Sequence, residues 1–249
     1  MRFLLLILLI NFHANATSSD RPDNYSELVD YVQQAPDQGE VATCLFMANT
    51  GAIELLANKK AGITNPEPYG EFDLSESFIM WAKTQPGAKS FIDAPVLKFN
   101  GGYGIHSSLW PFEAWTDGRI NYSVWDRHPA MDTLPRTPVP EVETIKLFEY
   151  GNRWTTRVLK KDHIEQIKDA LWKYKSPILV NYNDENFWHV ILIIGYDDRL
   201  PGTCYDTPQS ECSGVGSFYI RDSFGVRAEL RDYDWFRVKG NAAFVVKLK

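Results

Sequence analysis

The stretch DQGEVATCLFM, residues 37–47, places Cys44 at the point where the chain turns apolar, with Gln38 six positions before it. From Thr43 to Lys60 apolar residues recur at steps of three and four, two lysines close the run, and Gly62 follows. This pattern predicts a helix that carries cations at its negative C-terminal end. A single cysteine in such a helix is most often an ordinary core residue. Its role therefore depends on what the rest of the chain places near it.

The composition is that of a globular protein with an excess of acidic residues. The 249 residues are 44% hydrophobic and 14% aromatic, the formal net charge is −6 at pH 7, and no segment concentrates basic residues. A chain of this length can bury a sizeable core. The basic footprint of a nucleic-acid-binding protein is missing, so nucleic acid is excluded as a partner.

The N-terminus has the pattern of a secretory signal. Residues 1–16, MRFLLLILLINFHANA, combine Arg2, an apolar run from Phe3 to Ile10 and a small-x-small ending. We predict a signal peptide that is cleaved after Ala16. The apolar run is too short to anchor the protein in a bilayer, and no later stretch approaches the length of a transmembrane helix. We therefore expect a secreted or periplasmic protein with no integral membrane segment after cleavage.

Export makes the three cysteines informative, because oxidising compartments pair thiols. Cys204 and Cys212 bracket the turn-rich segment CYDTPQSEC, which a local disulfide can close. That pairing leaves Cys44 as an odd, unpaired thiol, which in an exported protein is a candidate reactive group.

Helical patterns come first in the chain and strand patterns second. Further helices are predicted at Ser75–Thr84, at Ser107–Thr116 and, with Asp162 as N-cap, at Asp162–Tyr174. The proline-rich segment Asp117–Glu143 is expected to be an irregular connection. Strands are predicted at Pro177–Asn181, Trp188–Tyr196, Gly216–Arg221 and Ala242–Lys247. This order predicts an α+β protein with a mainly helical domain over residues 17–140 and a β-rich domain over residues 141–249.

Four residues together fit the needs of a nucleophilic cysteine, which are a stabilised thiolate, a base and an oxyanion donor. Cys44 lies at the start of a predicted helix, where the dipole favours an anion. His189, in WHVILIIGYDD, can act as the base, and Asp222, in YIRDSFG, can orient its imidazole. Gln38 can donate its side-chain amide to an oxyanion alongside the Cys44 N–H.

In kind and order these residues resemble the landmarks of the papain-like cysteine peptidases. That family has a glutamine, a cysteine six residues later that opens a long helix, a histidine that heads a strand before Gly-Tyr, and an orienting residue before Ser-aromatic-Gly. The matching residues here are Gln38, Cys44, His189 with Gly195-Tyr196, and Asp222-Ser223-Phe224-Gly225. The segments LSES (74–77) and NGGYG (100–104) also resemble family motifs. The resemblance covers nearly the whole chain after residue 17.

The resemblance implies a two-domain fold in which a cleft between a helical domain and a barrel-like β-rich domain holds the active site. Gly102 would pair with the substrate backbone, and Glu54, ten residues after Cys44, matches a buried glutamate of the family. The residues implied for substrate binding are Gly101, Gly102, Tyr103, Trp188 and Val190. No cofactor or metal is implied, and the remaining histidines of the mature chain show no metal-ligand spacing.

The chain departs from the family at several positions. Asp222 stands where the family typically has asparagine, and Leu45 and Phe224 stand where it usually has tryptophans. A carboxylate at position 222 stabilises an imidazolium but also brings a negative charge near the thiolate, so the sign of its net effect stays open. Only residues 17–37 separate the predicted cleavage site from Gln38, so we expect no long inhibitory propeptide.

The expected function is that of an exported cysteine endopeptidase, a thiol hydrolase that acts on protein or peptide substrates through an acyl-enzyme. Two alternatives remain open at this stage. One is a papain-like binding protein whose catalysis has decayed, and the other is a transpeptidase or amidase on the same scaffold. Neither subsite preference nor oligomeric state follows from the sequence.

Overall fold

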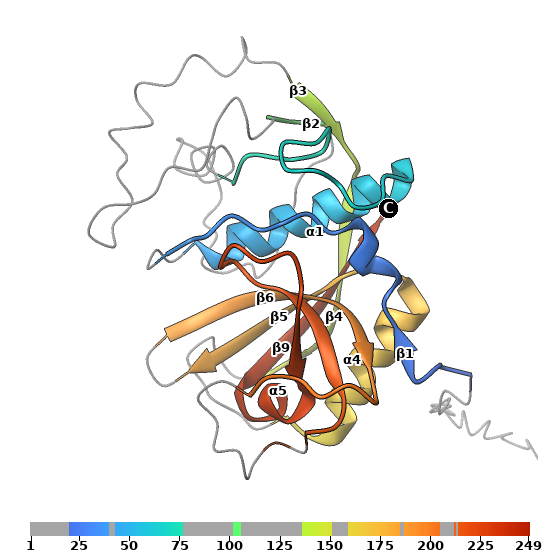
Figure 1. Ribbon diagram of the computed structural model, residues 1–249, viewed down its shortest axis with the longest axis vertical. Coiled ribbons are helices and arrows are strands. Elements are labelled where there is room, and N and C mark those ends of the chain that lie inside the picture. Colours follow the sequence, from blue (N-terminus) through green and yellow to red (C-terminus); the bar gives the residue numbers. More distant parts are fainter. Residues whose placement is uncertain are drawn as a thin grey trace, which may run out of the picture.

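The computed structural model describes residues 20–39, 43–76, 102–105, 136–150, 159–184, 187–204, 212 and 214–249. At its centre is an antiparallel sheet of seven strands, in the order β4-β9-β5-β6-β7-β8 with β1 added beside β6 (Figure 1). The strands are β1 Asn24–Tyr25, β4 Val142–Glu149, β5 Ile178–Asp184, β6 Phe187–Asp197, β7 Ser217–Arg221, β8 Glu229–Asp232 and β9 Gly240–Leu248. A second sheet pairs β2, Gly102–Ile105, with β3, Arg136–Val139.

Helices cover the central strands of the large sheet. The helical elements are η1 Glu27–Tyr31, α1 Cys44–Ala61, α4 Lys161–Tyr174 and α5 Tyr233–Lys239. In Figure 1 α1 crosses above the strands, and α5 lies below them. Helix α1 contacts β5, β6 and β9, while α5 contacts β5 and α4 contacts β6 and β9. The apolar runs 178–180 and 190–194 are each at most 1% exposed along their whole length, because both faces of these strands are covered.

The helix predicted from Thr43 to Lys60 is confirmed as α1, which starts at Cys44. It ends where Gly62 takes a left-handed conformation, with φ of 72°, and donates its N–H to the carbonyls of Asn58 and Lys59. The helix is buried on nearly every side, so that polar residues such as Asn49 and Glu54 are enclosed together with the apolar ones. The buried position expected for Glu54 is thereby confirmed.

The four predicted strands are confirmed as β5, β6, β7 and β9, and the helix predicted at Asp162–Tyr174 is confirmed as α4, but the N-cap at Asp162 and the irregular segment before β4 are wrong. The segment Asp117–Glu143 is not irregular where the structure describes it, because β3 and the start of β4 lie within it. Pro138 is compatible with β3 because a proline fits an edge strand. The helix predicted from Asp162 begins at Lys161 instead, and the Lys160 N–H donates to His163 Nδ1 over 2.8 Å. Asp162 lies in the first turn, where its charge suits the helix dipole.

The α+β class is confirmed, with helices packed on antiparallel strands. The boundary predicted between residues 140 and 141 stays a prediction, and β1 joins the N-terminal segment to β6 of the large sheet. The predicted signal peptide, most of the helix predicted at Ser75–Thr84 and all of that at Ser107–Thr116 lie outside the described residues. Within the described residues, no helix combines the length and the apolar character that a membrane crossing requires.

Candidate active site

Three of the predicted site residues come from three different elements and lie together. Cys44 is the first residue of α1, His189 is the third residue of β6, and Asp222 directly follows β7. Antiparallel pairing of Leu192 with Arg221 brings the start of β6 next to the end of β7. All three side chains are buried, with exposures of 2%, 2% and 3% for Cys44, His189 and Asp222.

A hydrogen-bonded chain joins the three side chains. His189 Nε2 lies 2.7 Å from Asp222 Oδ1, and the imidazole also forms a hydrogen bond with Cys44. Since Nε2 faces Asp222, Nδ1 is the ring nitrogen that faces the thiol. Phe224 stacks on the imidazole with an interplanar angle of 10° and a centroid distance of 5.5 Å. Tyr182 meets the same ring edge-on at 5.2 Å. The imidazole is therefore held in one orientation between an acceptor, a thiol and two aromatic rings.

The surroundings favour a charged imidazole. Burial on its own would lower the pKa of His189, but the hydrogen bonds to Asp222 and Cys44 outweigh it and raise this pKa to about 9. Burial likewise works to raise the pKa of Asp222, yet the bond from His189 and the nearby charge of Arg231 hold it below its ordinary value. Asp222 therefore stays ionised and His189 stays protonated at neutral pH.

Gln38 is fixed beside this group by Ser223. The Gln38 N–H donates to the Ser223 carbonyl over 2.8 Å, and the Ser223 hydroxyl donates to Gln38 Oε1. With Oε1 used as an acceptor, the Nε2 amide is the donor end of the Gln38 side chain. The Ser223 N–H also donates to Asp222 Oδ1 over 2.8 Å, so one residue positions both Gln38 and the carboxylate that faces His189.

The residues predicted to bind substrate lie in several places. Gly101 is outside the described residues, and Gly102 and Tyr103 lie in β2, whose partner β3 packs against α1. Trp188 is partly buried, whereas Val190 is 1% exposed and belongs to the hydrophobic core. Of these last two residues, only Trp188 has side-chain surface to offer a ligand.

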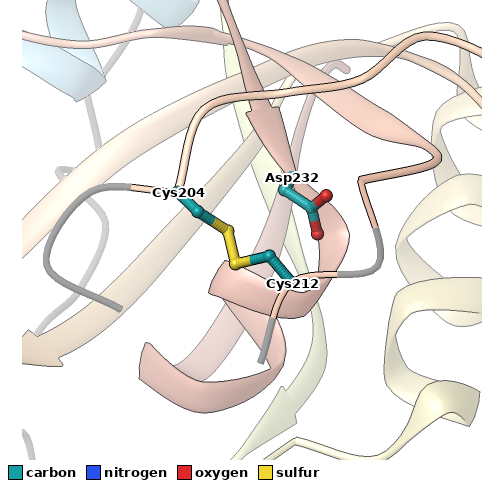
Figure 2. Close-up of side chains that lie close together, drawn as sticks. All are labelled: Cys204, Cys212 and Asp232. Atoms are coloured by element: carbon teal, nitrogen blue, oxygen red, sulfur yellow. A yellow bond between two sulfur atoms is a disulfide. The ribbon is translucent and has the colours of Figure 1, made fainter. Parts of the chain in front are cut away.

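The predicted disulfide between Cys204 and Cys212 is confirmed, and Cys44 is a free thiol. Figure 2 shows Asp232 beside this disulfide, and among the described residues these three side chains form a group of potential metal ligands. Both sulfurs are bonded to each other, however, and the Asp232 oxygens accept the N–H groups of Gly214 and Asp234. The group therefore acts as a brace for the loop that precedes β7.

Sequence reasoning missed two residues that contact this site. Arg231, on β8, lies 3.4 Å from Asp222 Oδ2, and Tyr182, on β5, forms a hydrogen bond with Arg231. Neither residue belongs to a short motif. The available signal was the aspartate itself, since a buried carboxylate at position 222 requires a counter-charge nearby.

No protein-family model matches the sequence, and no curated protein matches it. Solved structures do match. The clostridial cysteine protease Cwp84 gives a TM-score of 0.57 at 14% identity, over 91% of this chain and 58% of that chain. Procathepsin L 3 from the larval midgut of Tenebrio molitor gives 0.54 at 16%, over 93% and 72%. The stem bromelain precursor gives 0.52 at 12%, over 92% and 71%. The chain thus spans less than two thirds of Cwp84, and it has the fold of the papain-like cysteine proteases.

Proposed function

We propose that this chain is an exported cysteine endopeptidase in which Cys44 is the nucleophile, His189 the acid and base, and Asp222 the orienting residue. The observation that carries the proposal is the buried chain of hydrogen bonds from Cys44 through His189 to Asp222. A core cysteine requires no histidine and carboxylate in line behind it. A site whose catalysis has decayed would be expected to lose this alignment, because nothing would maintain it.

The chemistry follows from the positions of these groups. The Cys44 thiolate attacks the peptide carbonyl carbon, and the electron pair of the C=O bond moves to the oxygen. The N–H groups at the start of a helix lack intrahelical partners, so the Cys44 N–H and the Gln38 Nε2 amide bind this oxyanion. The C–N bond then breaks as the His189 imidazolium gives its proton to the leaving amine.

Hydrolysis of the acyl-enzyme runs the same steps with water. Neutral His189 takes a proton from the water as its oxygen attacks the thioester carbon, and the C–S bond breaks to restore the thiolate and the imidazolium. Asp222 keeps Nε2–H bonded throughout, which leaves Nδ1 to exchange the proton. No metal or cofactor takes part in these steps, and β2 supplies a backbone edge along which an extended substrate can pair.

A test of this function is the labelling of the purified protein by a peptidyl epoxide, read by mass spectrometry. We expect the label on Cys44, and a loss of about 100-fold or more in labelling rate in His189→Ala. The matched control is His163→Ala, which removes a histidine bonded to Tyr150 outside the site and should leave the rate unchanged. Equal labelling of Cys44 with and without His189, or no labelling at all, would overturn the proposal.

Labelling does not distinguish hydrolysis from acyl transfer, so a second measurement addresses the alternatives. Incubation of a peptide substrate with an added amine acceptor should give carboxylate products, as an endopeptidase requires. Products in which the acceptor amine is joined to the peptide would instead assign the site to a transpeptidase.

A further inference from the structure

Arg231 contacts the one oxygen of Asp222 that does not face the imidazole. Asp222 Oδ1 accepts from His189 Nε2 and from the Ser223 N–H, at 2.7 and 2.8 Å. Asp222 Oδ2 lies 3.4 Å from Arg231 Nη2. The two ends of the carboxylate are thus divided between the imidazole and a guanidinium whose side chain is 7% exposed. The buried Asp222 therefore has a buried cation, Arg231, as an ion-pair partner.

Three elements fix the guanidinium in this position. Its carbon lies 4.5 Å from the ring centroid of Trp235 on α5, and it bonds with Tyr182 on β5 and with Glu229 on β8. Trp235 and Tyr182 meet edge to face at 4.6 Å, so the arginine is enclosed between aromatic rings. A cation with few rotamers available contributes its charge at one place, which is the requirement for setting the electrostatics of a neighbouring site.

The backbone around Arg231 is also held from the outside. Arg231 pairs with Phe218 of β7, and on its other side it forms a parallel bridge with Thr203. Thr203 is the residue before Cys204, whose disulfide closes the adjoining loop. The Asp232 N–H donates to the Thr203 carbonyl over 3.2 Å. The disulfide therefore braces the strand that carries the arginine.

Charged groups of both signs surround Asp222. The groups that face it are His189 from β6, Arg231 from β8 and Tyr182 from β5, with Cys44 on the far side of the imidazole. Burial and the Asp222 carboxylate raise the pKa of Tyr182 beyond its usual range, so the phenol is neutral. Glu229 also contacts Arg231, and with 25% of its side chain exposed its charge is only partly screened, so Arg231 is shared between two carboxylates. Arg231 therefore offsets part of the negative charge that Asp222 presents to His189.

We propose that Arg231 is the positioning residue that lets an aspartate orient His189, because its guanidinium faces the second carboxylate oxygen and offsets part of the charge that an asparagine would not carry. The inference rests on the proposed function of Cys44 and His189. It predicts how the net charge of the pair at positions 222 and 231 changes between variants. The pair is neutral in the natural protein, carries one negative charge in Arg231→Met, one positive charge in Asp222→Asn, and is neutral again in the double variant.

The test is the rate of Cys44 alkylation by iodoacetamide as a function of pH, which needs no substrate. Removing a cation favours every protonated form nearby, so the midpoint in Arg231→Met should move up by about one pH unit. In Asp222→Asn the negative charge beside Arg231 is removed, so the midpoint should move down by a similar amount. The double variant should return close to the natural midpoint, since its charge is balanced.

Two further variants separate charge from structure. Arg231→Lys keeps the cation but loses the planar contacts, so its midpoint should stay within a few tenths of a unit while its alkylation slows. Arg237→Met removes an arginine that is paired with Asp234 on α5, and it should move nothing. Circular dichroism of each variant at each pH identifies any that fail to fold, and Arg231→Lys then provides the comparison.

The outcomes distinguish the two proposals. If Cys44 alkylation in the natural protein does not depend on His189, the proposed function fails and this inference fails with it. If alkylation depends on His189 but the midpoint is the same in Arg231→Met, Asp222→Asn and the natural protein, only the role of Arg231 is overturned. Recovery of the midpoint in the double variant supports it.

Discussion

Two buried arginines lie next to Asp222, Arg221 before it in the chain and Arg231 on the neighbouring strand β8, and the carboxylates that they contact have pKa values shifted in opposite directions. Arg221 turns toward α1, where Nη2 lies 3.5 Å from Glu54 and Nη1 and Nε donate to the carbonyls of Met47 and Gln33, each over 2.9 Å. The charge of Arg221 also acts on Glu76, where it works to lower the pKa. Arg231 turns toward Asp222 and Glu229.

The difference lies in how many donors each carboxylate receives. Burial and the neighbouring Glu76 raise the pKa of Glu54 well above its ordinary range, even though Arg221 and the Leu74 N–H oppose them. Burial also raises the pKa of Glu76, to about 7. Asp222 is almost as buried, yet its pKa is lowered, because an imidazole, a guanidinium and an N–H all face it. Burial therefore raises the pKa of the two glutamates near Arg221, whereas the donors around Asp222 outweigh burial and lower its pKa.

The largest effect should come from removing the cation of the Arg221 cluster, which consists of Arg221, Glu54 and Glu76. Arg221→Met removes the positive charge near the two buried glutamates and leaves the Met47 and Gln33 carbonyls without this donor. We expect a loss of about 3–5 kcal/mol in the free energy of unfolding at pH 7.5, measured by urea denaturation. The loss should be smaller at pH 5, because protonated glutamates need no counter-charge.

The control for this change is Arg237→Met, in which a half-exposed arginine is removed and the free energy of unfolding should stay within about 0.5 kcal/mol. A loss in Arg221→Met that is equal at pH 5 and pH 7.5 would show that packing, and not the buried charges, sets the cost.

The second effect isolates the protonation of Glu76. Because its folded-state pKa of about 7 exceeds its ordinary value of 4.5, its contribution to stability is complete below pH 4.5 and is lost as the pH rises through 7. Glu76→Gln cannot lose a proton, so at pH 8 it should be more stable than the natural protein by roughly 3 kcal/mol. At pH 4 the two should agree. Urea titrations between these pH values measure the difference, and a natural protein whose stability does not fall over this range contradicts the expected protonation.

The elements that the sequence predicts well are those with a local signal. Helix α1 has its apolar spacing and its terminal glycine, and β5 and β6 have unbroken apolar runs. Strand β8, ELRD, has no such run, and its register comes from pairing with β7. The prolines of the segment before β4 misled the prediction there, because a proline on an edge strand costs little.

The site divides in the same way. Cys44, His189 and Asp222 each stand in a short recognisable motif, and the structure places these three side chains in contact. Arg231 stands nine residues after Asp222 and looks like an ordinary surface charge in the sequence. Only the pairing of β7 with β8 and the packing of Trp235 turn it toward the carboxylate. Contacts that depend on strand register have no local sequence signal, whereas helix caps and apolar periodicity have one.

The prediction with the smallest effect asks whether the Arg221 cluster acts separately from Arg231 and Asp222. A Cβ at Gly51 of α1 would lie 2.1 Å from Arg221 Nη1 and 2.5 Å from its Cζ, so Gly51→Ala must displace the guanidinium. We expect a net loss of about 1 kcal/mol in unfolding free energy, since the clash outweighs the helix propensity that alanine gains. In an Arg221→Met background the penalty should shrink, because the blocking atoms are gone. The pH midpoint of Cys44 alkylation should stay where it is in both, since Arg231 still faces Asp222. A midpoint that moves with Gly51→Ala would mean that the Arg221 cluster also affects the charge around Cys44. The two arginines would then differ only in their positions.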